Sequence, residues 1–508
     1  MTVRLAILLC ALTLSPTLQA RTLPYTSQEE IKSLSIRGWN SAYNFDITGA
    51  HAAFDEASRI EPLHPRPHLG KAMIVFWRYL LNRSEKDKEA FFAIAEKTIE
   101  AGEKCEETYG EDADVKLSLG TIYGYRAFVN GRSKNYISAA WDGKKSYDYF
   151  CDALELDPKL YDAYLGVGLF HYFITFIPKP MQWVVGLMGI TGDTELGMKE
   201  MRIASQRGVF CKTEARYYLS QFLPWHEGEF DSGEGLLKGL HEEYPSNTLI
   251  SFTLAVWEMK RADMQTAKER LHTILRQPEA DLVGIKTFAS YKYAECLFRL
   301  NDFEGARTGY QRFLADYKDQ VYTATASYRA GYAFERSGKR DSAMTYYRKA
   351  VERERRFGDD AYSARRAKRL LASPLTGTDT LLTAAQNKQR SGAHDEAIRL
   401  FTQIQNTPSV SNDDMALATF GVGETMFDRK SYAEALPHFR KLSDSPIETE
   451  IWLKPWSHYY AGVCLAKGGD SEGAAAELRQ VFNYDEYDFK NWLEFRSRRE
   501  LTKLGHKP

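Results

Sequence analysis

Few residues in this chain have types and spacings that could perform chemistry. His64 and His68 flank a Pro-Arg-Pro turn and bring two imidazoles close together, but the cysteine or carboxylate cluster of a metal site does not accompany them. An ordinary surface loop is the simpler interpretation of this pair. The sequence also contains no G-x-S-x-G, no H-E-x-x-H and no Walker-type phosphate loop. We therefore expect no catalytic residue, no metal and no cofactor, and a protein that is not an enzyme.

Charge and cysteine content argue against two further classes of protein. The formal net charge is -1, so the chain carries no overall field that would attract nucleic acid. Apart from Cys10, the cysteines are odd in number, widely scattered and without a C-x-x-C pair. This arrangement does not suit a disulfide framework or a zinc site.

The first twenty residues have the pattern of a secretory signal peptide. Arg4 is their only charged residue, an apolar run follows from Leu5 to Leu14, and a small residue, Ala20, ends a segment typical of a cleavage site. The run is too short to span a bilayer. We expect residues 1–20 to be removed and the protein to be exported, which means the periplasm or cell envelope if the source is a Gram-negative bacterium.

Ala330 to Ala350 contains the unit from which most of the chain is built. Gly331 belongs to a first helix, a Ser-Gly-Lys turn follows, and Ala343, Tyr347 and Ala350 then recur at helical spacing on one face. Small residues let two helices approach closely, and the aromatic residues fill the space beside them. The stretch predicts two antiparallel helices joined by a short turn.

The unit recurs along the chain. Equivalent small residues lie 34 to 39 residues apart in two runs, Gly233, Ala267, Ala306 and Ala343, then Ala397, Ala435 and Ala474. This pattern resembles the tetratricopeptide repeat, whose period is ~34 residues. The resemblance implies an all-α fold, a right-handed superhelical solenoid of antiparallel helix pairs. We expect about eleven pairs and a C-terminal capping helix over Phe489 to Leu504.

Residues 157–204 carry a more specific resemblance. They are similar to the eukaryotic inclusion-body-clearance tetratricopeptide family and to exported bacterial tetratricopeptide proteins of unassigned role. The residues that carry this likeness are Asp157, Pro158, Tyr161, Gly166, Gly168, Pro178, Gly189, Gly192, Asp193 and Gly197. An apolar insert, 177–191, separates the two helices of this repeat. A plug buried against neighbouring helices is one interpretation, and a peripheral membrane contact through 170–190 is the other.

The segmentation predicted from these patterns has three parts after the signal peptide. Residues 21–372 form an N-terminal solenoid, 373–378 a linker, and 379–508 the C-terminal repeats with the capping helix. The segment before the linker, Arg353 to Leu371, is strongly basic. It is either a solvated helix or a site for an anionic surface.

A column of aromatic residues is the candidate binding site. In the tetratricopeptide family, the position three residues before the first-helix glycine tends to face the concave surface, and here it is usually aromatic. The candidate partner-binding residues are Tyr218, Phe252, Tyr291, Tyr328, Tyr332, Phe420 and Tyr459. Glu295, Arg299, Glu335, Glu424 and Asp428 would add both charge signs to the same groove. The same rings could instead pack between neighbouring helices.

Together these patterns predict an exported repeat scaffold. Its concave surface would bind a protein or peptide partner, and we expect no nucleic-acid partner. The alternative is a glycan- or cell-wall-associated binding protein of the envelope, because stacked aromatic rings on a concave surface also suit sugars.

Overall fold

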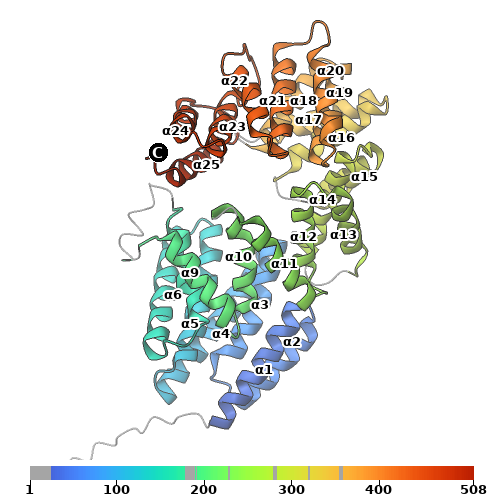
Figure 1. Ribbon diagram of the computed structural model, residues 1–508. Coiled ribbons are helices and arrows are strands. Elements are labelled where there is room, and N and C mark those ends of the chain that lie inside the picture. Colours follow the sequence, from blue (N-terminus) through green and yellow to red (C-terminus); the bar gives the residue numbers. More distant parts are fainter. Residues whose placement is uncertain are drawn as a thin grey trace, which may run out of the picture. The chain divides into compact units, whose positions relative to one another are not determined.

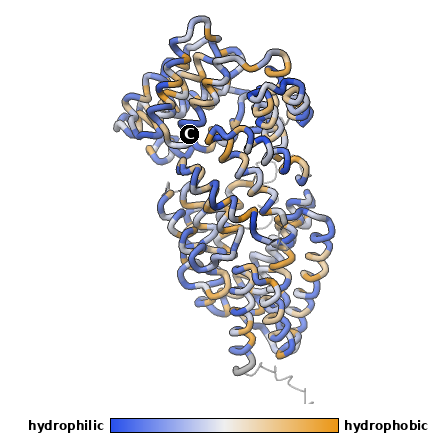
Figure 2. The backbone as a smooth tube through the Cα atoms, turned by 90° about the vertical axis from the view of Figure 1, so that its right-hand side faces the viewer, coloured by the Kyte–Doolittle hydropathy of each residue, from blue (hydrophilic) through white to orange (hydrophobic). Residues whose placement is uncertain are grey.

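The computed structural model describes residues 25–177, 189, 191–226, 229–278, 283–317, 321–353 and 358–507 (Figure 1). The expected signal peptide, 1–20, and most of the apolar insert, 177–191, lie outside these residues. Within them all regular structure is helical, as the sequence predicted. Hydrophilic and hydrophobic residues alternate along the helices, as expected when each helix buries one face (Figure 2).

Two compact units divide the chain between Asn247 and Thr248. The helices of the first unit are α1 (Tyr25–Tyr43), α2 (Ile47–Ile60), α3 (Pro65–Asn82), α4 (Glu85–Tyr109), α5 (Ala113–Arg132), α6 (Tyr136–Leu156), α7 (Ala163–Ile174), α9 (Thr194–Arg207), α10 (Lys212–His226) and α11 (Phe230–Glu243).

The second unit begins with α12 (Thr248–Lys260), α13 (Met264–Arg276), α14 (Val283–Arg299), α15 (Phe303–Asp316), α16 (Thr323–Arg336), α17 (Arg340–Glu352) and α18 (Asp359–Ala372). It continues with α19 (Gly377–Arg390), α20 (His394–Gln405), α21 (Asn412–Asp428), α22 (Tyr432–Ser443), α23 (Leu453–Lys467), α24 (Ser471–Gln480) and α25 (Lys490–Lys503). Among the described helices, consecutive partners form eleven packed pairs, and α18 and α25 stand outside the pairs. The repeat count and the capping helix α25 are therefore confirmed.

In several repeats an aromatic ring packs against glycines of the neighbouring helices. Phe54 of α2 is fully buried, and a methyl group built on Gly38 of α1 or on Gly70 of α3 would overlap its ring. The ring thus touches the first helix of its own pair and that of the next pair. In the predicted unit, a Cβ on Gly331 would lie 2.6 Å from the Tyr347 ring. Glycine is needed at these positions because nothing larger leaves room for the ring.

Several turns inside the pairs share one construction. A residue with positive φ ends the first helix, and in four of the described turns the aspartate that follows, Asp46, Asp263, Asp302 or Asp470, caps the second. Asn301 has φ 64°, and the Asp302 carboxylate accepts a hydrogen bond from Gly305 N at 2.9 Å. Ala262 has φ 64°, and Asp263 caps the next helix through Thr266 N at 3.1 Å. The carboxylate satisfies a backbone N–H that has no partner within the helix.

The first unit is tied together by one buried aspartate. The Asp162 carboxylate accepts hydrogen bonds from three consecutive backbone N–H groups, Val209 at 3.0 Å, Phe210 at 2.7 Å and Cys211 at 2.7 Å. Phe210 O in turn accepts from the Tyr43 hydroxyl at the end of α1, at 3.1 Å. The α9–α10 turn is therefore attached to both α7 and the first helix pair.

The segment 373–378 is a short loop that hydrogen bonds and ion pairs hold within the second unit. Leu375 N donates to Glu335 at 3.1 Å, and Asp379 receives Arg366 at 3.4 Å. The helix α19 already begins at Gly377, with Thr376 as its N-cap. Hydrogen bonds and ion pairs hold the predicted linker, 373–378, within the second unit. The boundary between the compact units lies elsewhere, between Asn247 and Thr248.

The basic segment before this loop forms α18 and pairs its arginines internally. Arg366 reaches Glu450 at 3.3 Å, Arg369 pairs with Asp379, and Arg365 pairs with Asp488. The opposite face of the helix buries alanines and leucine against the neighbouring pair. The prediction of a solvated helix holds in part, since Arg365 and Arg369 are 43% and 40% exposed as well as paired, and an anionic-surface site stays a prediction. Arg355 and Arg356 lie outside the described residues.

We predict that Ala343→Leu lowers the free energy of unfolding by about 1 to 3 kcal/mol, since a larger side chain overpacks a full contact. Ala343 is fully buried, and its carbonyl lies against Gly331. Urea unfolding measures the change, with the exposed Arg348→Leu in the same helix as control. Equal midpoints for the two variants would refute this packing.

We also predict that Asp162→Ala costs about 3 kcal/mol, because it leaves buried backbone N–H groups without an acceptor. The exposed Asp157→Ala is the matched control, since its carboxylate accepts only from nearby Lys159 N, at 2.9 Å. Thermal unfolding should separate the two variants clearly. Similar melting temperatures would show that Asp162 does not hold the first unit together.

Candidate functional site

The seven aromatic candidates fall into two groups. Four are buried, and their exposed fractions are 3% for Tyr291, 1% for Tyr332, 5% for Phe420 and 3% for Tyr459. The other three, Tyr218, Phe252 and Tyr328, are half-buried. The buried group matches the packing alternative, and a partner contact by any of the seven stays a prediction.

The buried rings are covered by neighbouring helices, and near Tyr332 also by a helix distant in sequence, α19. Asn387 of α19 donates to Phe298 O of α14 at 2.8 Å, and the Tyr332 ring lies 5.5 Å from that of Phe298. Tyr291 packs against the rings of Tyr322 at 5.0 Å and Phe313 at 5.1 Å. The repeat spacing does not predict the hydrogen bond between Asn387 of α19 and Phe298 O of α14, because several helices separate α14 from α19 along the chain.

Of the half-buried candidates, Tyr218 belongs to a carboxyl–aromatic cluster in the first unit. It lies one turn from Glu214 on α10, and its ring is 5.9 Å from that of Phe222. Glu214 accepts only a long hydrogen bond, 3.4 Å, from the Tyr125 hydroxyl. Burial, assisted by the charge of Asp162, raises the pKa of Glu214 to about 7. Near neutral pH this carboxyl is therefore only partly charged.

A group of cations surrounds Glu295 on the first helices of the second unit. Lys292 approaches its carboxylate at 2.8 Å and Arg329 at 3.5 Å, and Arg299 pairs with it as well. Burial alone would raise the pKa of Glu295, but Arg299, Lys292 and Arg329 together hold that pKa well below its ordinary value. Three cations facing one carboxylate leave a surplus of positive charge.

A pair of carboxylates lies on α21, in a later repeat of the same unit. One amide, Gln389 Nε2, donates to Glu424 at 2.9 Å and to Asp428 at 3.2 Å, and the Tyr460 hydroxyl donates to Glu424 at 3.1 Å. Burial, with the charge of Glu424 second, raises the pKa of Asp428 to about 6. Three consecutive first helices, α19, α21 and α23, thus contribute to this acidic pair.

Arg390 connects the two groups electrostatically. Its side chain is exposed, and within the part of the chain that the structure describes it forms no hydrogen bond or ion pair. Desolvation by the surrounding protein, followed by the charge of Arg299, lowers the pKa of Arg390, whereas Glu424 raises it. We call the set Glu295, Arg299, Arg329, Arg390, Glu424 and Asp428 the charged strip. It presents an unpaired cation beside a pair of carboxylates.

The sequence pattern predicted four residues of this strip, Glu295, Arg299, Glu424 and Asp428. It did not predict Arg390, Gln389 or Tyr460. A usable signal existed, because Arg299, Arg390 and Asp428 each end a first helix two residues before the positive-φ turn residue. Glu335, by contrast, is engaged in the fold, since it accepts from the Tyr347 hydroxyl at 2.7 Å.

The histidine pair has a structural role. His64 is buried and caps α3, and its Nδ1 accepts from Arg66 N at 3.3 Å. Burial, with the charge of Arg66 second, lowers the pKa of His64 to about 3, so the ring stays neutral. His68 Nε2 contacts Pro62 O at 3.1 Å.

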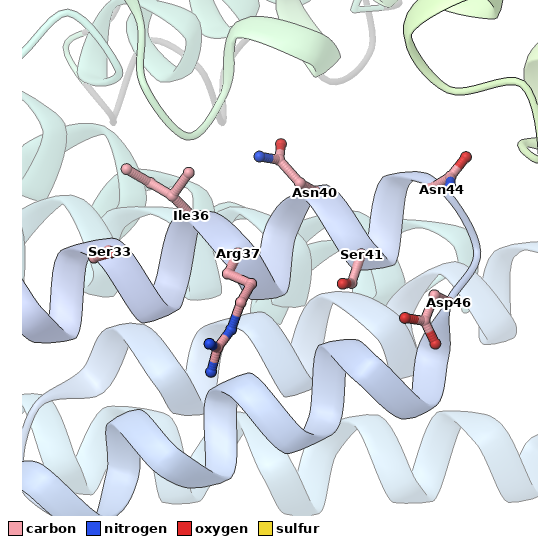
Figure 3. A pocket seen from close by; sticks show the side chains of 7 residues that line it. All are labelled: Ser33, Ile36, Arg37, Asn40, Ser41, Asn44 and Asp46. Atoms are coloured by element: carbon pink, nitrogen blue, oxygen red, sulfur yellow. The ribbon is translucent and has the colours of Figure 1, made fainter.

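A shallow depression of about 490 Å³ lies on the first unit over α1 (Figure 3). It is lined by Ser33, Ile36, Arg37, Asn40, Ser41, Asn44 and Asp46. Their polar groups already have partners in the fold: Asn40 accepts from the Tyr244 hydroxyl at 3.2 Å, and Asp46 caps α2 through Gly49 N at 2.9 Å. This surface offers a ligand little that is not already engaged. None of the described helices is long and apolar enough to cross a membrane.

One family model and several solved structures are similar to parts of this chain. Residues 162–373 match the family model described as Iml2/Tetratricopeptide repeat protein 39. Among solved structures, a tetratricopeptide repeat protein from Parabacteroides merdae matches at 15% identity and a TM-score of 0.24, covering 57% of this chain and 98% of its own. Yeast Tom70 matches at 12% identity and a TM-score of 0.31, covering 84% and 86%.

The family match confirms the specific resemblance predicted around residues 157–204, since it begins at Asp162. Antiparallel helix pairs continue through the other described repeats, and aromatic–glycine contacts recur in several of them. The described helices thus form an array of tetratricopeptide-like pairs, and residues 162–373 match the Iml2/Tetratricopeptide repeat protein 39 family model.

Proposed function

We propose that this protein binds an extended protein or peptide segment along the charged strip of its second unit. The observation that carries the proposal is the exposed, unpaired guanidinium of Arg390 beside the Glu424–Asp428 pair. A guanidinium without a partner is ready to bind a carboxylate, which it can hold through two parallel hydrogen bonds. The two carboxylates can hold a lysine or arginine side chain of the same ligand.

The distribution of the charges favours a peptide over a sugar. The strip carries arginines on α14, α16 and α19 and two carboxylates on α21, and a peptide with separate acidic and basic residues matches such a pattern. A glycan reader needs exposed ring faces, and four of the seven aromatic candidates are buried. The glycan or cell-wall alternative therefore has fewer residues to support it.

Export is a second part of the proposal. It rests on the sequence pattern of residues 1–20 alone, with its single Arg4 and its apolar run. The partner would then be a protein outside the cytoplasm, in the periplasm or cell envelope if the source is a Gram-negative bacterium.

The proposal predicts that Arg390→Ala weakens partner capture by about ten-fold, because the ligand loses its charge-assisted contact. Cross-linking in the source cell followed by mass spectrometry identifies the partner from the wild-type protein, and titration of that partner compares the variants. Arg399→Ala, on the exposed face of α20, removes the same charge elsewhere and should bind normally. Equal affinity of the two variants would remove the charged strip from the binding site.

The raised pKa of Asp428 yields a prediction on stability. Because this pKa is about 6 in the folded chain, above the ordinary aspartate value of 3.8, the charged carboxylate costs stability above pH 6, and this cost is absent below pH 3.8. Asp428 is exposed, so solvent screens much of this cost, and Asp428→Asn should raise the free energy of unfolding at pH 8 by less than about 1 kcal/mol, with no gain at about pH 3.5.

Urea unfolding at both pH values measures this difference, and Asp485→Asn at an exposed position is the control. A gain that appears at low pH and vanishes at high pH would contradict the assigned direction.

A further inference from the structure

The turn between α5 and α6 carries a concentration of exposed apolar side chains. Ile137 is 74% exposed and Trp141 69%, the two largest fractions among the exposed large hydrophobic side chains of the described residues. Tyr136 at 50% and Phe128 at 48% lie at the same turn. We call these four residues the turn patch. Side chains of this size are usually buried, so this grouping indicates a surface that meets another phase or molecule.

Helical geometry places the two most exposed members together. Ile137 and Trp141 are four residues apart on α6, which puts them on one face, one turn from each other. α6 packs along α5, and Phe128 lies on the last turns of that helix (Figure 1). A buried hydrogen bond joins α6 to α5, since Asn130 Nδ2 donates to the Asp142 carboxylate at 2.8 Å. The exposure therefore belongs to a firmly packed helix pair.

The charges around the turn patch are mostly positive. Arg132 and Lys134 are exposed and, among the described residues, form no ion pair, and Arg132 lies over the Phe128 ring at 6.0 Å. From Arg126 to Asp148 the sequence contains five basic and two acidic residues, in a chain whose net charge is -1. Arg126 pairs with Glu96 and with the buried Asp142, and Lys144 pairs with Asp148, so these charges offset one another. Arg132 and Lys134 leave the turn itself cationic.

From this combination we infer that the turn patch is a docking site for an anionic membrane surface. Tryptophan and tyrosine favour the boundary between lipid chains and headgroups, and isoleucine and phenylalanine enter the apolar side of that boundary. Arginine and lysine beside them attract anionic headgroups. The occupant is thus the surface of an anionic bilayer, with Trp141 and Ile137 inserted and Arg132 and Lys134 against the headgroups. This inference is independent of the peptide-binding proposal, which concerns the second unit.

The test is flotation of the full chain with vesicles of phosphatidylcholine alone or with about one third phosphatidylglycerol. The wild type should float with the anionic vesicles and much less with the neutral ones, since Arg132 and Lys134 supply the charge. The double variant Ile137→Ser, Trp141→Ser should bind anionic vesicles about ten-fold more weakly, because it loses the inserted side chains. Arg132→Glu, Lys134→Glu should weaken anionic binding specifically.

A matched control is Val209→Ser, Ile451→Ser, which removes two side chains of 49% and 48% exposure outside the patch. Residues 1–20 are common to all variants, so binding through them cannot produce a difference. Unchanged flotation of the Ile137→Ser, Trp141→Ser variant, with circular dichroism showing a native fold, would overturn the inference. A self-association that this variant abolishes, without vesicle binding by the wild type, would overturn it in favour of a second copy of the chain.

Discussion

The close contact between an aromatic ring and the glycines of two successive first helices is the interaction on which the rest of this structure depends. Phe54 touches Gly38 and Gly70, and Phe150 does the same with Gly120 and Gly166. Each ring therefore fixes the distance inside one pair and the position of the next. Because a repeat cannot bury its apolar face alone, these shared rings turn a series of short helices into a continuous core. The charged strip needs this frame, since its residues come from separate helices.

The candidate binding site of the second unit consists of charged side chains that the fold does not fully pair. Most of its inner charges are neutralised: Arg366 meets Glu450 and Asp379, and Arg369 meets Asp379. Arg390 is an exception within the described residues, and the carboxylates beside it share a single amide donor. An exposed cation that the fold leaves unpaired can bind an external anion. The turn patch of the first unit is similar in kind, with apolar side chains that the fold does not cover.

The sequence predicted the contacts that depend on residue spacing within one repeat. Gly331, Ala343 and Tyr347 lie as the repeat pattern required, and the family resemblance is confirmed from Asp162 onward. It could not predict contacts between helices far apart in the chain. Tyr332 is buried because α19 returns to α14, which no period of about 34 residues reveals. The expected linker at 373–378 is instead held by Glu335 and Asp379, because single polar contacts can fasten a loop that composition marks as free.

The most direct test of the aromatic–glycine contact is to compare the stabilities of two glycine-to-alanine variants, one at such a contact and one at an open helix position. A methyl group on Gly166 would overlap the Phe150 ring, whereas Gly235 on α11 has no atom within 4 Å of an added methyl group. Alanine stabilises an exposed helix by about 1 kcal/mol relative to glycine. Urea unfolding should therefore show opposite signs: Gly235→Ala more stable than wild type and Gly166→Ala less stable by about 1 to 3 kcal/mol. A Gly166→Ala protein as stable as Gly235→Ala would contradict the account.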